Sequence, residues 1–327
     1  MPRLLPPSVV ALIAGLSAAA AAWAGGTTVD VDATGSGVWL TTGSSVVEVD
    51  PGSGKVLRRV RPRYPAAIEL GASDGQIWVS SVTNGFGAGA VTRIPVEPWR
   101  KPSSPLVLPT RPVLSLAVGS GTTWALVGPW AKLRIAAIDQ ASGRIRYVPV
   151  GKRVGWLAAD ASGQTPGLFA VTGAGLLERL GSGGRPLWTA LPEGVAAPPV
   201  VDGGVVFAAT RTAVYRVDAA NGAVVARCPL RSAATTLAVG GGYLWALALR
   251  GTAGRRYVLQ KLEPRRMRVV GGRVLRAPLG GLSYGQEALW IGRATPRPGG
   301  GSADVELLRV DPRTLLVRVA ARNLDIG

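Results

Sequence analysis

Short apolar runs separated by glycine-rich turns follow one another along almost the whole chain. Residues 35–60, GSGVWLTTGSSVVEVDPGSGKVLRRV, contain three such runs, with an Asp-Pro-Gly turn between the last two. Apolar and polar residues alternate with a period of two in several runs, which is the pattern of half-buried β-strands. A hairpin of two or three strands is marginal in water by itself. The pattern therefore predicts a larger all-β assembly in which such stretches pack against one another.

One run in each group carries an aromatic residue near its centre, and this motif recurs seven times. Successive aromatic residues are 38 to 46 positions apart. They are Trp39, Trp78, Trp124, Phe169, Phe207, Trp245 and Trp290, and we call them the anchor aromatics. A repeat of about 40 residues that contains four strands is typical of a β-propeller blade. We expect each anchor aromatic to lie on the second strand of its blade and to wedge against a neighbouring blade.

An acidic residue opens a turn after most of the anchors. In the first repeat this turn reads Val49-Asp50-Pro51-Gly52. The side chain of an aspartate can start such a turn, and a glycine or asparagine supplies the positive φ. The acidic residues at these turns are Asp50, Asp139, Asp218, Glu263 and Asp311. Turn formation explains them, so they are not candidates for catalysis.

The repeats predict one all-β domain, a single seven-bladed β-propeller of four-stranded blades behind a signal peptide. In the first blade the expected strands are roughly 28–33, 37–42, 45–50 and 55–61. The expected blades are about 27–63, 64–110, 111–152, 153–193, 194–231, 232–276 and 277–327. The fourth repeat is the weakest, so six or eight blades are the alternatives. We find no sign of a blade shared between the two termini.

The first 24 residues differ from the rest of the chain. Arg3 precedes an apolar run over 8–22, and Ala22-Trp23-Ala24 matches a signal-peptide cleavage site. The run is short for a membrane span, which needs about 20 residues. We expect cleavage after Ala24 and a secreted or extracytoplasmic protein in the cell envelope, with an uncleaved anchor as the alternative.

Charge and cysteine content narrow the choice of partners. The formal net charge is +18, and arginine supplies most of it. The densest basic stretches are Lys55–Arg63 and Arg255–Arg273, which leaves two interpretations open: binding to anionic cell-envelope polymers, or a secreted chain that is simply basic. Nucleic acid is disfavoured because aromatic and basic residues are not regularly interleaved. Cys228 is the only cysteine, so no intramolecular disulfide can form, and we expect it to be buried.

The repeat motifs resemble those of secreted bacterial propellers of the Tyr-Val-Thr-Asn-repeat (YVTN), quinoprotein-like (PQQ) and streptogramin-lyase group. Gly37-Val38-Trp39, followed by Val49-Asp50-Pro51, matches the streptogramin-lyase form of the repeat. The resemblance covers nearly the whole predicted mature chain, and it concerns the scaffold. It would imply a catalytic histidine and a magnesium ion for a lyase, whereas this sequence contains no histidine. The tryptophan-docking motif of the quinoproteins does not recur either.

Without histidine and with one cysteine, acid–base chemistry falls to carboxylates, lysine or tyrosine. Asp30 and Glu69 each stand nine residues before their anchor, and Asp32 shares a strand face with Asp30. The ring of predicted inner-strand positions that we single out contains Asp30, Asp32, Glu69, Ser115, Trp156 and Thr236. Oxygen ligands of this kind suit Ca²⁺ or Mg²⁺, or a small polar ligand. The competing interpretation is that the acids are solvated at the channel mouth or paired with arginines.

Extended loops supply a second set of candidates. Trp99, Arg100 and Lys101 lie in one insertion, and Trp130 and Lys132 in another, and both pair an indole with cations as recognition surfaces do. We expect a non-catalytic binding or interaction scaffold without a required cofactor, whose partner is a protein, a glycan or a small molecule. The alternative is a lyase or hydrolase with a carboxylate–metal site at Asp30, Asp32 and Glu69.

Overall fold

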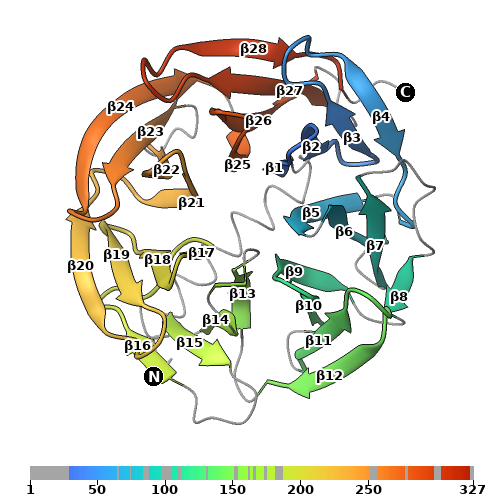
Figure 1. Ribbon diagram of the computed structural model, residues 1–327, viewed down its shortest axis with the longest axis horizontal. Coiled ribbons are helices and arrows are strands. Elements are labelled where there is room, and N and C mark those ends of the chain that lie inside the picture. Colours follow the sequence, from blue (N-terminus) through green and yellow to red (C-terminus); the bar gives the residue numbers. More distant parts are fainter. Residues whose placement is uncertain are drawn as a thin grey trace, which may run out of the picture.

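A computed structural model shows seven antiparallel sheets arranged in a ring around one axis (Figure 1). It describes residues 29–64, 66–73, 75–83, 88–96, 105–108, 112–129, 132–150, 154–160, 163–164, 167–172, 175–180, 187–250, 256–276, 279–297 and 303–324. Each sheet consists of four strands that are consecutive in the sequence. The predicted seven-bladed β-propeller is confirmed, and no blade combines strands from both ends of the chain. Within the described residues, no helix is long and apolar enough to cross a membrane.

Within each blade the four strands are ordered from the first, next to the ring axis, to the fourth, at the outer rim. Blades 1 to 3 comprise β1 (Val31–Ala33), β2 (Val38–Thr41), β3 (Val46–Val49), β4 (Val56–Val60); β5 (Ala66–Ser73), β6 (Gln76–Val82), β7 (Gly89–Pro95), β8 (Leu106–Leu108); and β9 (Val113–Val118), β10 (Thr122–Val127), β11 (Arg134–Asp139), β12 (Ile145–Pro149). Blades 4 and 5 comprise β13 (Val154–Ala159), β14 (Leu168–Thr172), β15 (Leu176–Leu180), β16 (Leu187–Ala190); and β17 (Val200–Asp202), β18 (Val205–Ala209), β19 (Ala213–Asp218), β20 (Val224–Pro229). Blades 6 and 7 comprise β21 (Ala234–Gly240), β22 (Tyr243–Leu249), β23 (Arg256–Glu263), β24 (Arg268–Arg276); and β25 (Leu279–Gly285), β26 (Ala288–Pro296), β27 (Ala303–Val310), β28 (Val317–Ala321).

All seven anchor aromatics lie on the second strand of their blades, as expected. The buried apolar residues described form seven clusters with apolar residues of the following blade; six contain an anchor aromatic, and the part-buried Trp124 packs against the seventh. Trp39, for example, packs with Ile77 and Val79 of blade 2. Both faces of each sheet are therefore buried between neighbours. This burial explains why a repeat that would have only marginal stability by itself is stable in the ring.

The predicted turn aspartates are confirmed as turn formers. The carboxylate of Asp50 accepts the backbone N–H of Ser53 at 2.6 Å, and Asp139 does the same for Ser142 at 2.7 Å. The hydroxyls of Ser53 and Ser142 also donate to these carboxylates, and the hydroxyl bonds first and the backbone bonds second lower the pKa of both carboxyls below the ordinary value. Cys228 is buried, also as expected.

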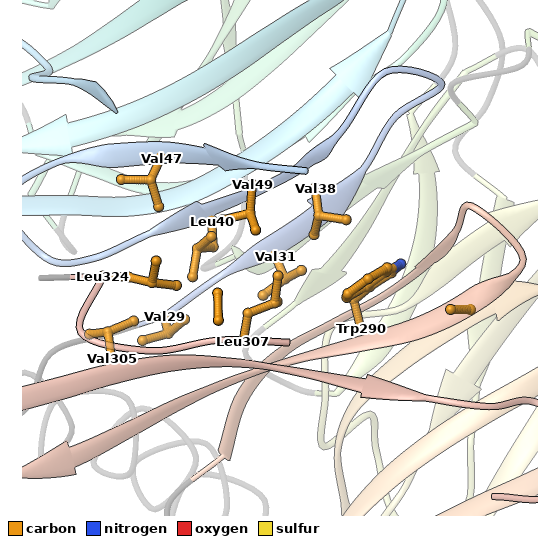
Figure 2. Packing of buried hydrophobic residues seen from close by; sticks show 12 residues of the cluster. Val29, Val31, Val38, Leu40, Val47, Val49, Trp290, Val305, Leu307 and Leu324 are labelled. Atoms are coloured by element: carbon orange, nitrogen blue, oxygen red, sulfur yellow. The ribbon is translucent and has the colours of Figure 1, made fainter. Parts of the chain in front are cut away.

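The ring closes through apolar packing between blade 7 and blade 1, without a shared sheet. Trp290 on β26 packs with Val31, Val38 and other apolar residues of blade 1 (Figure 2). Its indole N–H donates to the carbonyl of Gly285 at 2.9 Å, which fixes the orientation of the ring. Blade 7 thus contacts blade 1 as every other blade contacts its successor.

Hydrogen bonds reinforce this junction near the axis of the ring. The N–H of Gly281 donates to the carbonyl of Val29 at 2.6 Å. A Cβ at Gly281 would lie 2.5 Å from the N atom of Val31, so only glycine allows this approach. The Ser283 hydroxyl donates to Asp32 at 3.1 Å and accepts the N–H of Ala33 at 3.2 Å.

The outer part of the same junction is closed by the C-terminal segment. Leu324 is buried in the cluster, and its N–H donates to the carbonyl of Val305 at 3.1 Å. Arg59 of β4 donates to the Leu324 carbonyl at 2.9 Å. The turn glycine Gly54 approaches Ala320 so closely that a Cβ there would lie 1.9 Å from the Ala320 carbonyl oxygen. The last described residues therefore contact blade 1 at β4 and at the turn between β3 and β4.

Trp290→Ala tests the closure. The side chain is fully buried, so its removal leaves a cavity between blades 7 and 1, and we expect the free energy of unfolding to fall by about 3–5 kcal/mol. Trp290→Phe keeps much of the volume and should cost less. Urea unfolding followed by tryptophan fluorescence and circular dichroism measures both values. A loss of under about 1 kcal/mol for the alanine variant would contradict the closure described here.

Candidate functional site

The predicted acidic residues lie on or beside the innermost strands of blades 1 and 2. Asp30 directly precedes β1, Asp32 lies on β1, and Glu69 lies on β5. All three side chains are part-buried. In Figure 1 the strands β1 and β5 are neighbours near the axis of the ring. The structure therefore places the three acids on neighbouring inner strands of the ring, as the repeat spacing predicts.

Both aspartates bind backbone amides of the next blade. One carboxylate oxygen of Asp30 accepts the N–H of Leu70 at 2.9 Å, and its other oxygen accepts the N–H of Val31 at 3.0 Å. Asp32 accepts the N–H of Ala72 at 2.7 Å with one oxygen, and the hydroxyl of Ser283 with the other. All four carboxylate oxygens thus accept a hydrogen bond from the protein.

The same arrangement continues into blades 3 and 4. The Glu69 carboxylate accepts the N–H of Leu116 and a hydrogen bond from the Ser115 side chain. The hydroxyl of Ser115 in turn accepts the N–H of Leu157 at 3.2 Å. We call Asp30, Asp32, Glu69 and Ser115 the inter-blade row, because each member joins its own inner strand to the inner strand of the next blade.

Burial shifts the titration of the row. Removal from water is the main cause that raises the pKa of Asp30 to about 7, of Asp32 to about 6 and of Glu69 to about 8. Repulsion from Asp32 adds to the shift of Asp30, and repulsion from Asp30 adds to that of Glu69. The hydrogen bonds from the backbone amides oppose these rises without cancelling them.

Neither of the two environments considered for the acids, free solvation or pairing with arginine, describes these contacts. Their partners are backbone amides and serine hydroxyls. Among the described residues, no three of the histidine, cysteine, aspartate and glutamate side chains are grouped so that they could hold a metal ion. The Ca²⁺ or Mg²⁺ site at the acids stays a prediction.

The other predicted site residues are more scattered. Trp156 of β13 is part-buried against the apolar cluster between blades 4 and 5, and Thr236 lies on β21 of blade 6. Lys132 is exposed. Trp99, Arg100, Lys101 and Trp130 lie outside the described residues. Of the inner-strand positions singled out from the sequence, Asp30, Asp32, Glu69 and Ser115 each accept a backbone N–H of the next blade.

A pocket between blades 1 and 2, with a volume of about 390 Å³, was not expected from the sequence. It is lined by Thr34, Gly35, Ser36, Ala72, Ser73, Gly75, Gln76 and Val96. The first three residues belong to the β1–β2 turn, and Ser73, Gly75 and Gln76 belong to the β5–β6 turn and its ends. Such turns look like simple connections in the sequence, which is why the pattern gave no signal of a pocket.

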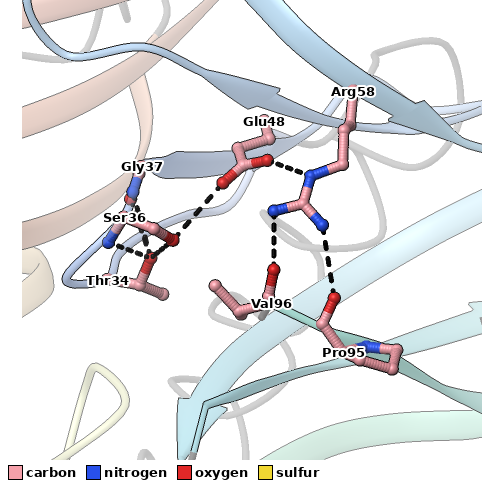
Figure 3. A network of polar contacts seen from close by, with 7 residues as sticks. All are labelled: Thr34, Ser36, Gly37, Glu48, Arg58, Pro95 and Val96. Carbon is pink, nitrogen blue, oxygen red and sulfur yellow. Dashed lines mark hydrogen bonds and ion pairs between the residues drawn. The ribbon is translucent and has the colours of Figure 1, made fainter. Parts of the chain in front are cut away.

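A polar network holds the wall of this pocket (Figure 3). The Ser36 hydroxyl donates to the buried Glu48 at 3.5 Å, and Glu48 forms an ion pair with Arg58. Arg58 also donates to the carbonyls of Pro95 at 3.3 Å and Val96 at 2.9 Å. The network therefore ties the β1–β2 turn of blade 1 to the end of β7 in blade 2.

Glu69→Gln tests the raised pKa. An unfolded glutamate titrates near its ordinary value of 4.5, whereas folded Glu69 holds its proton up to about 8, so ionisation disfavours the folded state as the pH rises between these values. Glutamine carries no charge. We expect the stability of Glu69→Gln relative to wild type to increase from about pH 5 to about pH 9, as measured by urea unfolding at each pH.

Asp50→Asn is the matched control for this experiment. The pKa of Asp50 is lowered, so its contribution to stability changes only at pH values below the ordinary 3.8, and the difference from wild type should stay constant over the same range. A constant difference for Glu69→Gln as well would contradict the raised pKa.

Comparison with known proteins supports the fold alone. No protein-family model matches the chain, and no curated protein matches it. Among solved structures, the computationally designed Ika8 protein, in the crystal structure of its packing No. 1 in P63, is similar with a TM-score of 0.59. The match covers 91% of this chain and 89% of that one at 12% sequence identity. This chain therefore shares its β-propeller architecture with a designed protein, and the likeness extends to the fold only.

Proposed function

We propose that this chain is a non-catalytic, extracytoplasmic binding scaffold that presents its turns and loops from a rigid ring. The observation that carries the proposal is the inter-blade row. Every oxygen of Asp30 and Asp32 accepts a hydrogen bond within the protein, and Glu69 is engaged by Leu116 and Ser115. Carboxylates in this arrangement stabilise the contact between blades rather than activate a substrate.

The chemistry of the rest of the chain supports the same proposal. The sequence contains no histidine, and its one cysteine is buried, with a pKa that burial raises. Burial in apolar surroundings makes a thiol inert. The extracytoplasmic part of the proposal rests on the apolar run at 8–22 and on the cleavage motif at Ala22-Trp23-Ala24.

The alternative, a lyase or hydrolase that uses a carboxylate-held metal, makes a different prediction for divalent cations. We expect wild-type protein to show no calorimetric heat of binding and no rise in Tm with Ca²⁺ or Mg²⁺, because the carboxylate oxygens already accept protein hydrogen bonds. Bound ligand would raise Tm by mass action. A cation-dependent rise in Tm that is abolished in Asp30→Asn and Glu69→Gln, and kept in Asp50→Asn, would contradict the scaffold proposal and favour the enzyme.

A second candidate function is binding to anionic cell-envelope polymers. It is favoured by the outer part of blade 6, where β23, β24 and the turn between them expose Arg256, Arg265, Arg266, Arg268, Arg273 and Arg276. Glu263 is the acidic residue of these two strands and pairs with Arg266 and Arg268. The remaining arginines give this rim a positive field that attracts anionic polymers.

Neutralising part of this rim tests the second candidate. The triple change Arg256→Gln, Arg265→Gln and Arg276→Gln should weaken binding to immobilised polyphosphate by about tenfold at low salt, since each charge contributes roughly 0.5 kcal/mol. Binding of wild type should fall steeply as salt screens the charges. The control replaces Arg134, Arg144 and Arg146 of blade 3, which removes the same charge elsewhere. Equal losses in both triple variants, or salt-insensitive binding, would contradict a specific rim.

A further inference from the structure

The outermost strand of blade 6 differs from the outermost strands of the other blades in its length. β24 is nine residues long and lies at the outer rim of the ring (Figure 1). The described outer strands of the other blades, β4, β8, β12, β16, β20 and β28, have three to six residues. Natural proteins keep exposed edge strands short, because a long free edge can pair with another chain.

The backbone of the second half of β24 has no partner on its outer side. β24 pairs with β23, and within the described residues no other backbone hydrogen bond reaches Gly271–Arg276. At the start of the strand the N–H of Val269 donates to the sulfur of Cys228 on β20, so the free edge begins after this contact. Gly271 and Gly272 carry no side chain that would keep a second backbone away from this edge.

Two arginines lie opposite each other at the end of this free edge. Arg256 on β23 and Arg276 on β24 are directly paired in the register, and both are exposed. Like charges in directly opposite positions destabilise a sheet. Among the described residues neither arginine forms an ion pair. The sequence from 219 to 286 contains one acidic residue, Glu263, which pairs with two other arginines.

An exposed apolar residue lies on the same face as this arginine pair. Val274 of β24 is paired with Val258 of β23 and is 48% exposed. Residues two positions apart in a strand share a face, so Val274 and Arg276 lie on one face of the sheet. A strand added to the free edge would therefore place one residue beside Val274 and, two positions away, another beside Arg276.

We propose that the free edge of β24 binds an extended acidic segment of a partner protein by strand addition. In this mode main-chain hydrogen bonds give affinity, and alternate side chains give specificity. A carboxylate of the added strand beside Arg276 relieves the repulsion between Arg276 and Arg256, and an apolar residue two positions away covers Val274. A second copy of this chain is disfavoured, because two β24 strands would place one basic edge against another. This proposal rests on the scaffold function and names its partner class.

A heptapeptide of alternating glutamate and valine, labelled with a fluorophore at its N-terminus and amidated at its C-terminus, tests the proposal on the full chain. We expect binding in fluorescence anisotropy at low salt. Arg276→Glu should weaken this binding by about tenfold and strengthen binding of the peptide with lysine in place of glutamate. Arg146→Glu, at an exposed position on the outer strand β12, makes the same change of charge and should leave both affinities unchanged.

N-methylation of the peptide separates strand addition from attraction by charge alone. In an added strand the N–H groups of alternate residues face the neighbouring strand, and the others face solvent. Two peptides methylated at alternate positions, one at odd and one at even positions, have the same charge and the same number of methyl groups. We expect one of them to lose binding by at least about tenfold and the other to retain it.

Three results would overturn the strand-addition proposal. The first is no binding of the glutamate peptide up to millimolar concentration. The second is equal binding of the two methylated peptides, which would assign the binding to charge and favour an anionic polymer at this rim. The third is sedimentation of the wild type as a dimer that Val274→Glu dissociates, which would assign the edge to a second copy. None of them bears on the cation titration of Asp30 and Glu69, so failure of this proposal is distinguishable from failure of the scaffold function.

Discussion

Each innermost strand of the ring has an edge that no strand of its own sheet covers, and the amides along this edge need hydrogen-bond acceptors. In blades 2, 3 and 4 a side chain from the preceding blade supplies them: Asp30 and Asp32 for Leu70 and Ala72, Glu69 for Leu116, and Ser115 for Leu157. At the junction of blades 7 and 1 the partners are a backbone carbonyl and Ser283. The anchor aromatics pack the apolar faces of the same junctions. Adjacent blades are thus held by apolar burial between the faces and by hydrogen bonds near the axis.

This arrangement explains why acidic residues occupy positions near the axis at which the pKa of their carboxyls is raised. A carboxylate with two hydrogen bonds from amides or hydroxyls can be buried at a tolerable cost, and the cost appears as the raised pKa values of Asp30, Asp32 and Glu69. Perturbed carboxylates near the axis of a ring are also what a catalytic site would show. Here the partners are backbone amides of the same and the next blade and the hydroxyls of Ser283 and Ser115, and our proposal of a structural role rests on them.

The sequence predicts the fold well because each repeat carries its own strands, turn and anchor. Trp39 and Trp245 identify second strands from local pattern alone, and Asp50 identifies its turn. The role of Asp30 depends on a partner 40 residues away, the Leu70 amide, and amides leave no trace in a pattern of side-chain types. The one available signal was that this separation is close to the repeat length. The pocket could not be predicted from the sequence, because it forms where the β1–β2 and β5–β6 turns of two blades meet, which only the packed structure reveals.

The closure of the ring has a consequence for how the protein reaches and leaves its native state. Because every sheet is built from consecutive strands, six junctions join segments that are close in the sequence, and the seventh joins Ser283 to Ala33, 250 residues apart. Closing this long loop costs more entropy than closing any other junction, by roughly 1.6 kcal/mol relative to a loop of about 40 residues, because the cost grows with the logarithm of loop length. Blades can add to one another as in an open array, and we expect the contact between blades 7 and 1, which is the most non-local of the seven, to form late. We therefore expect a partly unfolded ring to open at the junction between Trp290 and Val38.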